Sequence, residues 1–391
     1  PFYNRFPKLE NFKAQIKQKG ASFSLENRNT LVSVLKKQYQ NVETSQLTKQ
    51  HIESLKSEHT FTITTGHQLN LFTGPLYFLY KIVSTINLSK ELKAEYPENN
   101  FVPIYWMATE DHDFDEINYF NFKGKKFQWS KDEGGAVGEL SNEGLKALFK
   151  NAYLDHDNLS DATRFLANEL FKDYGLVIID ANERPLKRLF ISHVETELLN
   201  QTAFDAVSEM NVKLSSISED YKIQVNPREI NLFYLAKNLR ERIVFEDDVY
   251  KVLNTDIIFS KSEIQKVLLE HPERFSPNVI MRPLYQEVIL PNLCYIGGGG
   301  ELAYWMQLKD YFDKVEVTFP ILLLRNSVLI QTEKQAKKLK KLDVSIEDIF
   351  LKRDALINKK VREISNIDID FSIQKNQLKQ QFENLFNLAK K

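Results

Sequence analysis

Short apolar segments alternate with longer amphipathic segments over the first 220 residues of the chain. Residues 60–66 (TFTITTG), 101–108 (FVPIYWMA) and 176–181 (LVIIDA) are rich in β-branched and aromatic residues, which is typical of buried strands. Helical periodicity lies between them. The helix whose first turn holds Pro75 is expected to bury one apolar face, made of Leu76, Leu79, Tyr80, Val83 and Ile86. This alternation predicts βαβ units and a parallel sheet, and hence an α/β fold.

The pattern changes after residue 220. Short strand-like runs separated by polar turns, such as Asp247-Asp248, predict a small antiparallel insertion. The parallel pattern then returns with a strand, four glycines and a helix, and a basic helical segment follows it. This segment carries an apolar stripe that needs a partner helix, so a coiled coil is one interpretation; the stripe consists of Ile373, Leu378, Phe382, Leu385 and Phe386. The predicted parts are an N-terminal helical segment (1–59), the core (60–220 and 281–331), an antiparallel and helical insertion (221–280) and a helical arm (332–391).

Composition narrows the class of protein. The 391 residues carry a formal net charge of −1, which gives no electrostatic case for binding nucleic acid or an anionic membrane. The sequence contains no run of about twenty apolar residues, so it predicts no membrane span. The one cysteine, Cys294, excludes an intrachain disulfide and indicates a reducing cytoplasm. Because the chain begins at Pro1 and ends inside a helical pattern, we expect both termini to be truncated.

Three predicted strand-to-helix junctions carry unusual residues, and ligands of open α/β sheets bind outside the carboxyl ends of the strands. The first junction is Gly66-His67-Gln68. A helix N-terminus offers free N–H groups to a phosphate or carboxylate, and a neighbouring histidine can add a hydrogen bond or a proton. The alternative is that His67 only caps the turn.

The second junction is the acidic cluster Glu110-Asp111-His112-Asp113. Its carboxylates can take a proton from an amine, hold a metal ion or accept hydrogen bonds from sugar hydroxyls, and His112 can act as a base or a ligand. The alternative is a solvated loop. We favour a functional role, because acidic residues that directly follow a buried strand are otherwise costly.

The third junction is the glycine run from Gly297 to Gly300, followed by Glu301. Glycines allow a backbone to approach a ligand closely, but the run matches neither G-x-G-x-x-G nor a P-loop. Arg282, just upstream, suits a bidentate clamp on a carboxylate or phosphate, with a surface salt bridge as the alternative. Tyr304 follows the glycines in the helix and is expected to line the same pocket.

Together these motifs resemble the BshC family, the cysteine ligases of bacillithiol synthesis. The resemblance rests on TGHQLNLFTGPLYFLYKI, VPIYWMATEDHDFDEIN and RPLYQEVILPNLCYIGGGGELAYW, in that order, and on the basic helical tail. It implies a Rossmann-like parallel-sheet core with inserted connecting segments and a C-terminal helical coiled-coil arm. Family members are often dimeric, so the resemblance also implies a homodimer, and they generally extend beyond this chain.

The resemblance implies a reaction in which cysteine is joined to the amine of glucosaminyl malate. Asp111, His112 or Asp113 would take the amine proton, while Glu110 or Glu301 would hold sugar hydroxyls. Arg282 and the helix start at His67 would hold the malyl carboxylates or a phosphate. The other residues expected in the substrate site are Gly66, Gln68, Gly297, Gly298, Gly299, Gly300 and Tyr304.

A free carboxylate does not condense with an amine unaided, so an activating cosubstrate is needed, and ATP with Mg²⁺ is the natural candidate. The family core is similar to class I nucleotidyltransferases, whose HxGH motif contacts ATP phosphates, but this chain has Thr-Gly-His-Gln there. The only segment that is similar to a KMSKS signature is FSKS at 259–262. The cofactor is therefore left open.

Two other classes of function are consistent with the sequence. One is a metal-dependent hydrolase or transferase that uses His67 and the cluster from Glu110 to Asp113, although no H-x-x-x-H spacing supports it. The other is a non-catalytic scaffold that binds a partner through its coiled-coil arm.

Overall fold

The computed structural model describes residues 2–110, 117–122, 125–128, 143–217, 221–237, 239–364 and 371–389. The chain forms two compact units, residues 1–327 and 328–391. The first unit includes the N-terminal helices together with the sheet.

A five-stranded parallel sheet forms the centre of the first unit, as the sequence predicts. Its strands are β1 (Thr60–His67), β2 (Asn100–Met107), β5 (Val177–Asp180), β11 (Asn292–Gly297) and β12 (Ile321–Leu324). The order is β12-β11-β1-β2-β5, so the chain moves outward from β1 in one direction and then returns to its other side. This is the Rossmann strand order, and its switch point lies between β1 and β11, where such sheets bind ligands.

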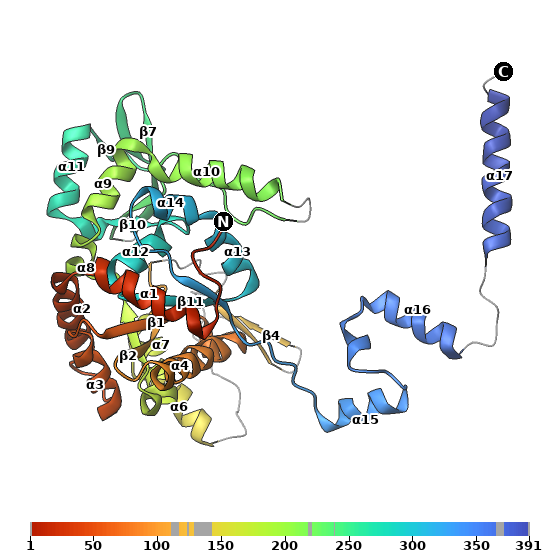
Figure 1. Cartoon of the computed structure of the whole chain (residues 1–391), viewed down its shortest axis with the longest axis horizontal. Coiled ribbons are helices and arrows are strands. Elements are labelled where there is room, and N and C mark those ends of the chain that lie inside the picture. Colours follow the sequence, from red (N-terminus) through yellow and green to blue (C-terminus); the bar gives the residue numbers. More distant parts are fainter. Residues whose placement is uncertain are drawn as a thin grey trace. The chain divides into compact units, whose positions relative to one another are not determined.

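Helices enclose the sheet (Figure 1). The helix α4 contacts β1, β2 and β11, while α1 packs on β11 and α13 on β12. The helices of this unit are α1 (Leu9–Ser22), α2 (Leu25–Gln38), α3 (Gln46–Ser54), α4 (Tyr77–Glu95), α6 (Glu143–Leu154), α7 (Leu159–Phe171), α8 (Arg184–Arg188), α9 (Ile191–Asn200), α10 (Thr202–Ser215), α11 (Lys261–Glu270), α12 (Met281–Ile289), α13 (Gly299–Gln307) and α14 (Lys309–Lys314). Short 3₁₀ turns are η1 (Leu71–Thr73), η2 (Lys172–Tyr174) and η3 (Pro272–Arg274).

The buried face of α4 differs from the predicted one. The helix begins at Tyr77, two residues after Pro75, and Leu76 is 45% exposed. Its buried positions are Phe78, Lys81, Ile82, Ser84, Thr85, Ile86, Leu88, Ser89 and Leu92. Three of these are hydroxyl residues, each of which donates to the carbonyl four residues earlier in the helix. Because their hydroxyls are satisfied within the helix, they can be buried, and a pattern read from apolar residues alone misplaces the face.

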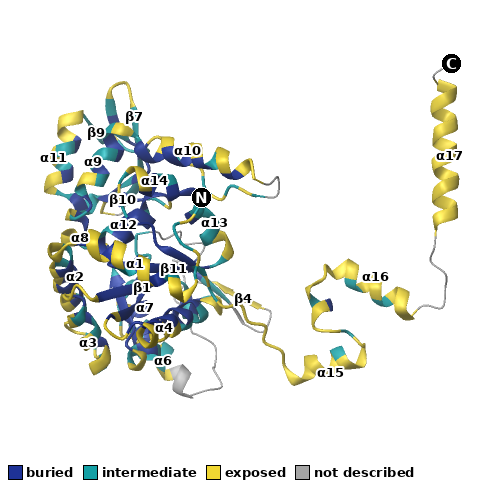
Figure 2. Cartoon of the chain, viewed as in Figure 1, coloured by how far each residue is buried: buried dark blue, intermediate teal, exposed yellow. Residues whose placement is uncertain are grey.

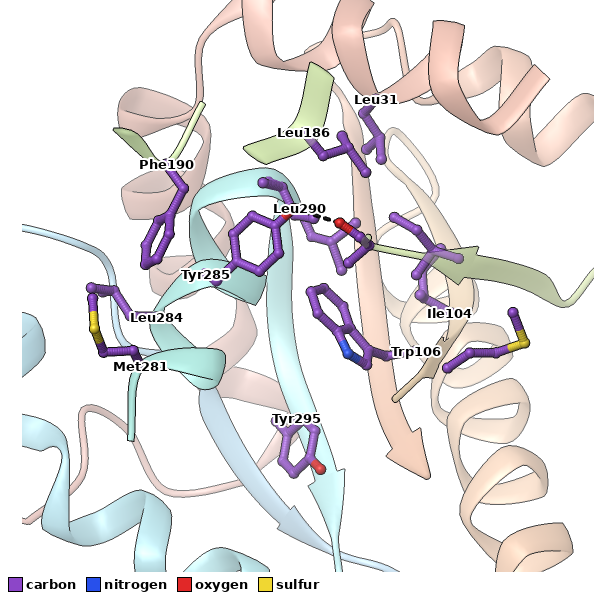
Figure 3. Packing of buried hydrophobic residues seen from close by; sticks show 14 of the residues in the cluster. Leu31, Ile104, Trp106, Leu186, Phe190, Met281, Leu284, Tyr285, Leu290 and Tyr295 are labelled. Atoms are coloured by element: carbon purple, nitrogen blue, oxygen red, sulfur yellow. Dashed lines mark hydrogen bonds between the residues drawn. The ribbon is translucent and has the colours of Figure 1, made fainter. Parts of the chain in front are cut away.

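Aromatic side chains fill the core beside the switch point. Figure 3 shows Trp106 of β2 next to Tyr285 of α12, and their ring centroids are 5.7 Å apart in an edge-on contact. The Tyr285 hydroxyl donates to the carbonyl of Ala181 (2.7 Å), which satisfies the polar end of a fully buried ring. Tyr295 of β11 stacks on Trp305 of α13. These contacts fix β2, α12, β11 and α13 around one edge of the sheet.

A buried ion pair joins α1 to the same core. The Nζ of Lys19 donates to the carbonyl oxygen of Glu287 (2.7 Å) and lies 3.4 Å from its carboxylate. That carboxylate also accepts from the side chains of Asn292 and Gln286. Thr64 of β1 donates to Asn292, so the network runs from α1 through α12 to the strands β11 and β1.

The predicted antiparallel insertion is present. Its sheet has the order β10-β6-β7-β8-β9, and Asp247 and Asp248 form the β7–β8 hairpin turn with φ of +54° and +61°. The segment FSKS lies here as well, where Ser260 caps the first turn of α11 and bonds reciprocally with Glu263. It therefore serves as a helix cap. The strands are β6 (Leu232–Ala236), β7 (Leu239–Glu246), β8 (Val249–Val252), β9 (Ile258–Phe259) and β10 (Phe275–Pro277), and a separate hairpin consists of β3 (Tyr119–Phe122) and β4 (Lys125–Gln128).

The second unit is helical, with α15 (Glu333–Lys341), η4 (Glu347–Phe350), α16 (Arg353–Ile364) and α17 (Ser372–Ala389). The predicted apolar stripe lies on α17, and each of its side chains is more than half exposed (Figure 2): Ile373, Leu378, Phe382, Leu385 and Phe386. The homodimer expected through this stripe stays a prediction. None of the helices in the described ranges is long and apolar enough to cross a membrane.

Candidate functional site

A cavity of about 510 Å³ opens at the carboxyl ends of β1, β2 and β11. This size and position are typical of a small-molecule site in an open α/β sheet. The cavity brings together most of the residues that the sequence singles out: Gly66, His67, Gln68, Glu110, Arg282, Gly298, Gly299, Gly300, Glu301 and Tyr304. The predicted residues Asp111, His112 and Asp113 lie outside the described residues.

An ion pair between Lys81 and Glu301 crosses this cavity from α4 to α13. The two groups are 2.6 Å apart, and Lys81 also donates to the carbonyl of Gly66 at the end of β1 (2.9 Å). Glu301 accepts two further hydrogen bonds, from the Tyr295 hydroxyl (2.8 Å) and the Gly298 backbone N–H (2.7 Å). Burial lowers the pKa of Lys81, and its contact with Glu301 opposes that shift. The pair thus ties the ends of β1 and β11 together.

Arg282 occupies the wall of the cavity rather than an open surface. It donates to Gln286 (3.2 Å) on its own helix and to the Tyr304 hydroxyl (3.4 Å) on α13. Its guanidinium also lies 5.8 Å from the ring centroids of Trp106 and Tyr295. The interpretation of Arg282 as a surface salt bridge is therefore wrong, because these hydrogen-bond partners are neutral groups and its charge faces the cavity.

Arg325 adds a third cation to the cavity. It follows β12, and its backbone N–H donates to the carbonyl of Gly297 (2.9 Å). The guanidinium lies 4.9 Å from the ring centroid of Tyr77. Its Nε is buried and has no hydrogen-bond partner in the described part of the chain. A buried donor of this kind is costly unless a ligand or water accepts from it.

His67 is the last residue of β1, and its ring contacts those of Tyr77 and Phe78. The predicted helix start at His67 is wrong, because α4 begins only at Tyr77. Burial, and then the positive charge of Lys81, lower the pKa of His67 to about 3. The imidazole is therefore neutral near pH 7, and it can donate or accept a hydrogen bond there without carrying a charge. Its Nε2 is buried and meets no partner among the residues described.

The glycine run has two separate roles. A Cβ at Gly297 would come within 3.0 Å of the Tyr295 ring and 3.1 Å of the Glu301 Cβ, so packing explains this glycine. In contrast, a Cβ at Gly299 would meet no atom within 4 Å. Gly298, Gly299 and Gly300 form the open N-terminus of α13 on the cavity, where free N–H groups favour an anion.

The opposite side of the cavity is formed by the end of β2. Glu110 pairs with Lys187 of α8 at 2.6 Å, and Lys187 also donates to the carbonyl of Phe275 (3.0 Å). Burial lowers the pKa of Lys187, and Glu110 opposes that shift. Thr109 donates to Asp180 (2.6 Å) at the end of β5. These bonds hold the first residues of the acidic cluster in place, with Glu110 on the cavity wall.

No group of three or more His, Cys, Asp and Glu side chains that could hold a metal ion lies within the described ranges. Of the five residues in the metal-site alternative, His67 and Glu110 are described, and Glu110 is paired with Lys187. That alternative would need Asp111, His112 and Asp113, which are not among the residues that the structure describes.

Three residues of this site were not found by sequence reasoning: Lys81, Lys187 and Arg325. Lys81 could have been noticed in the sequence, because it interrupts the most apolar turn of its helix, FLYKIV. A lysine there is either solvent-exposed or paired inside the protein. Arg325 could have been noticed in a similar way, because it directly follows the apolar run FPILLL. Lys187 lies in the basic segment RPLKR, and only the folded chain brings it to Glu110 on the cavity wall.

Comparison with known protein families agrees with this architecture. Residues 1–326 match the family model described as "Bacillithiol biosynthesis BshC, N-terminal Rossmann-like domain". Residues 328–391 match the model described as "Bacillithiol biosynthesis BshC, C-terminal coiled-coil domain". The Rossmann-like core and coiled-coil arm implied by the resemblance are thus confirmed, and the border agrees with the division at residue 327.

Related proteins carry the name "Putative cysteine ligase BshC". The relative from Flavobacterium johnsoniae is 60% identical over 99% of this chain and 76% of its own length. The relative from Christiangramia forsetii is 56% identical over 100% of this chain and 77% of its own. A more distant one, from Staphylococcus saprophyticus, is 30% identical over 77% of this chain and 59% of its own. The name denotes a ligase, the class of enzyme that the sequence predicts, and the chain belongs to the BshC family of bacillithiol biosynthesis.

Proposed function

We propose that this protein joins L-cysteine to the free amine of glucosaminyl malate, forming the amide bond that completes bacillithiol. The family assignment and the name of its relatives support a cysteine ligase. The cavity at the sheet's switch point is the proposed site of the reaction, because it gathers the charged residues of three junctions.

The observation that carries the proposal is the charge balance of this cavity. Lys81, Arg282 and Arg325 line it as cations, and Glu301 offsets one of them. The pair of Glu110 and Lys187 is neutral as a whole. Among the described residues the cavity therefore holds two surplus positive charges. The malyl group carries two carboxylates, so its charge matches this surplus.

The amino sugar would then extend from the malyl group toward the end of β2. Glu110 lies there on the cavity wall, where its carboxylate can accept hydrogen bonds from sugar hydroxyls or from the ammonium group. Asp111, His112 and Asp113 remain the proposed bases for the amine, because they directly follow Glu110 in the chain. His67 would serve as a neutral hydrogen-bonding group beside the malyl end.

The cysteine carboxylate must be activated before an amine can attack it. ATP with Mg²⁺ is the first cosubstrate to test, although the FSKS segment gives it no support, since its Ser260 serves as a helix cap. If a nucleotide binds, Arg325 and the N–H groups at the start of α13 are the groups suited to a phosphate.

Mass spectrometry of the full-length protein tests the proposal. The protein is incubated with glucosaminyl malate, cysteine, ATP and Mg²⁺, and each component is omitted in turn. Product in the complete mixture alone supports the ligase and identifies its activator. Arg282→Gln should lower product formation at least about tenfold, because a charge-assisted contact with the malyl group is lost. Absence of product from every mixture, although the protein is folded, would rule the proposal out.

A further inference from the structure

We propose that Glu301 sets the charge selectivity of the cavity, so that it favours dicarboxylate groups over tricarboxylates. The inference rests on the proposed function in one respect, since the malyl group is the dicarboxylate concerned. It assigns Glu301 a role different from the expected one, in which this carboxylate would hold sugar hydroxyls.

The contacts of Glu301 support a fixed internal charge. Its two oxygens accept from the Tyr295 hydroxyl (2.8 Å), the Gly298 N–H (2.7 Å) and the Lys81 ammonium (2.6 Å). These donors come from a strand, the glycine run and α4, so the carboxylate is held from three sides. A carboxylate already engaged by three donors has little capacity left for sugar hydroxyls.

The position of this charge explains its effect on ligands. Glu301 accepts a hydrogen bond from the residue that precedes α13, so it lies at a helix N-terminus that would otherwise attract anions. It also neutralises one of the three cations that line the cavity. Without it, none of these three cations would have a carboxylate partner among the described residues of the cavity, which would favour a more highly charged anion.

Glu301→Gln is the variant that separates charge from shape. The amide oxygen can keep the bonds from the Gly298 N–H and Lys81, while its NH₂ group can donate to the Tyr295 hydroxyl, which then accepts. The substitution thus removes one negative charge and retains every contact. Arg325→Gln changes the cavity in the opposite direction, because it removes one positive charge.

Succinate and tricarballylate are suitable probes, since they differ by one carboxylate and neither has a hydroxyl group. Their affinities for the full-length protein are measured by isothermal titration calorimetry, at a pH where both are fully ionised. We expect Glu301→Gln to shift the ratio of affinities toward tricarballylate by about tenfold, and Arg325→Gln to shift it toward succinate. The control is Glu91→Gln, an exposed glutamate on α4 that changes net charge away from the cavity.

The inference would be overturned if Glu301→Gln left the ratio of the two affinities unchanged. It would also be overturned if neither anion bound to the wild type or to this variant. A matching shift in Glu91→Gln would also overturn it, because net charge alone would then explain the result. The ligase proposal fails separately, through the absence of product. If the ratio of affinities shifted but no product formed, the role of Glu301 in selectivity would be supported and the proposed reaction would be ruled out.

Discussion

Three Lys–Glu pairs are enclosed in the described part of the chain, and two of them look alike in isolation. Lys19 and Glu287 link α1 to α12, and Lys81 and Glu301 link α4 to α13. In each pair the lysine also donates to a backbone carbonyl, and the glutamate accepts from two further groups. Both lysines are almost completely buried, with side-chain exposures of 2% and 4%.

The pairs differ in what surrounds them. The Glu287 side chain is 0% exposed, and its other contacts are the neutral side chains of Gln286 and Asn292. The Glu301 side chain is 27% exposed and faces a cavity that Arg282 and Arg325 also line. A pair whose charges cancel inside the core serves the fold, whereas surplus cations around a pair indicate a site for an anionic ligand.

The largest expected effect concerns the core pair. Lys19→Met leaves the Glu287 carboxylate buried without its countercharge, and breaking a buried pair in this way costs about 3–5 kcal/mol of unfolding free energy. Burial raises the pKa of Glu287 and lowers that of Lys19, and the contact between the two groups opposes both shifts. Urea denaturation at neutral pH measures the loss. Adding Glu287→Gln should recover part of it, because no uncompensated charge then remains.

Lys81→Met sharpens the comparison. Its loss of stability should be smaller than that of Lys19→Met, since Glu301 keeps two hydrogen bonds and partial exposure to solvent. Lys37→Met, at an exposed lysine on α2, provides the baseline. If Lys81→Met proved the more destabilising of the two, the distinction between a core pair and a ligand-site pair would be lost.

A smaller effect is expected from His67 as a function of pH. Its pKa is lowered to about 3 in the folded protein, against about 6.5 when unfolded. As the pH falls below 6.5, His67 binds a proton in the unfolded state but not in the folded state. The free energy of unfolding therefore declines until about pH 3. The slope from this residue is at most about 1.4 kcal/mol per pH unit.

His67→Gln should remove this part of the acid sensitivity, and urea denaturation between pH 5 and 7.5 measures it. The other buried histidines, His51 and His193, also have lowered pKa values, so the wild type and the variant must be compared at each pH. Identical slopes would show that the pKa of His67 is not lowered in the folded protein, which would contradict its burial beside Lys81.

Much of the fold could be predicted from the sequence, because strand runs and helical periodicity depend on local patterns. The strands β1, β2, β5 and β11, the antiparallel insertion and the hairpin turn at Asp247-Asp248 were predicted near their observed positions, whereas the hairpin β3–β4 was not predicted. The buried face of α4 was not, since Ser84, Thr85 and Ser89 are polar by type and are buried only because the helix satisfies their hydroxyls. Such satisfaction is visible only in three dimensions.

The residues of the candidate site also fall into those that could be predicted from the sequence and those that could not. Junction residues such as His67, Arg282 and Glu301 could be found, because the carboxyl ends of parallel strands must meet at one edge of the sheet. Arg325 directly follows β12 and could have been found by the same rule, whereas Lys187 could not, since its role depends on which helix packs beside which strand. The expected function of Glu301 also changed once its three donors were known. Position could thus be predicted better than role.

The central claim is that surplus positive charge in this cavity binds the malyl group. Isothermal titration calorimetry of the full-length protein with glucosaminyl malate and with its malyl dimethyl ester tests this claim most directly. The diester keeps the sugar and the malyl carbon chain but loses both negative charges. The account predicts that it binds at least about a hundredfold more weakly, since two charge-assisted contacts are lost. Equal affinity for the two compounds would contradict the account.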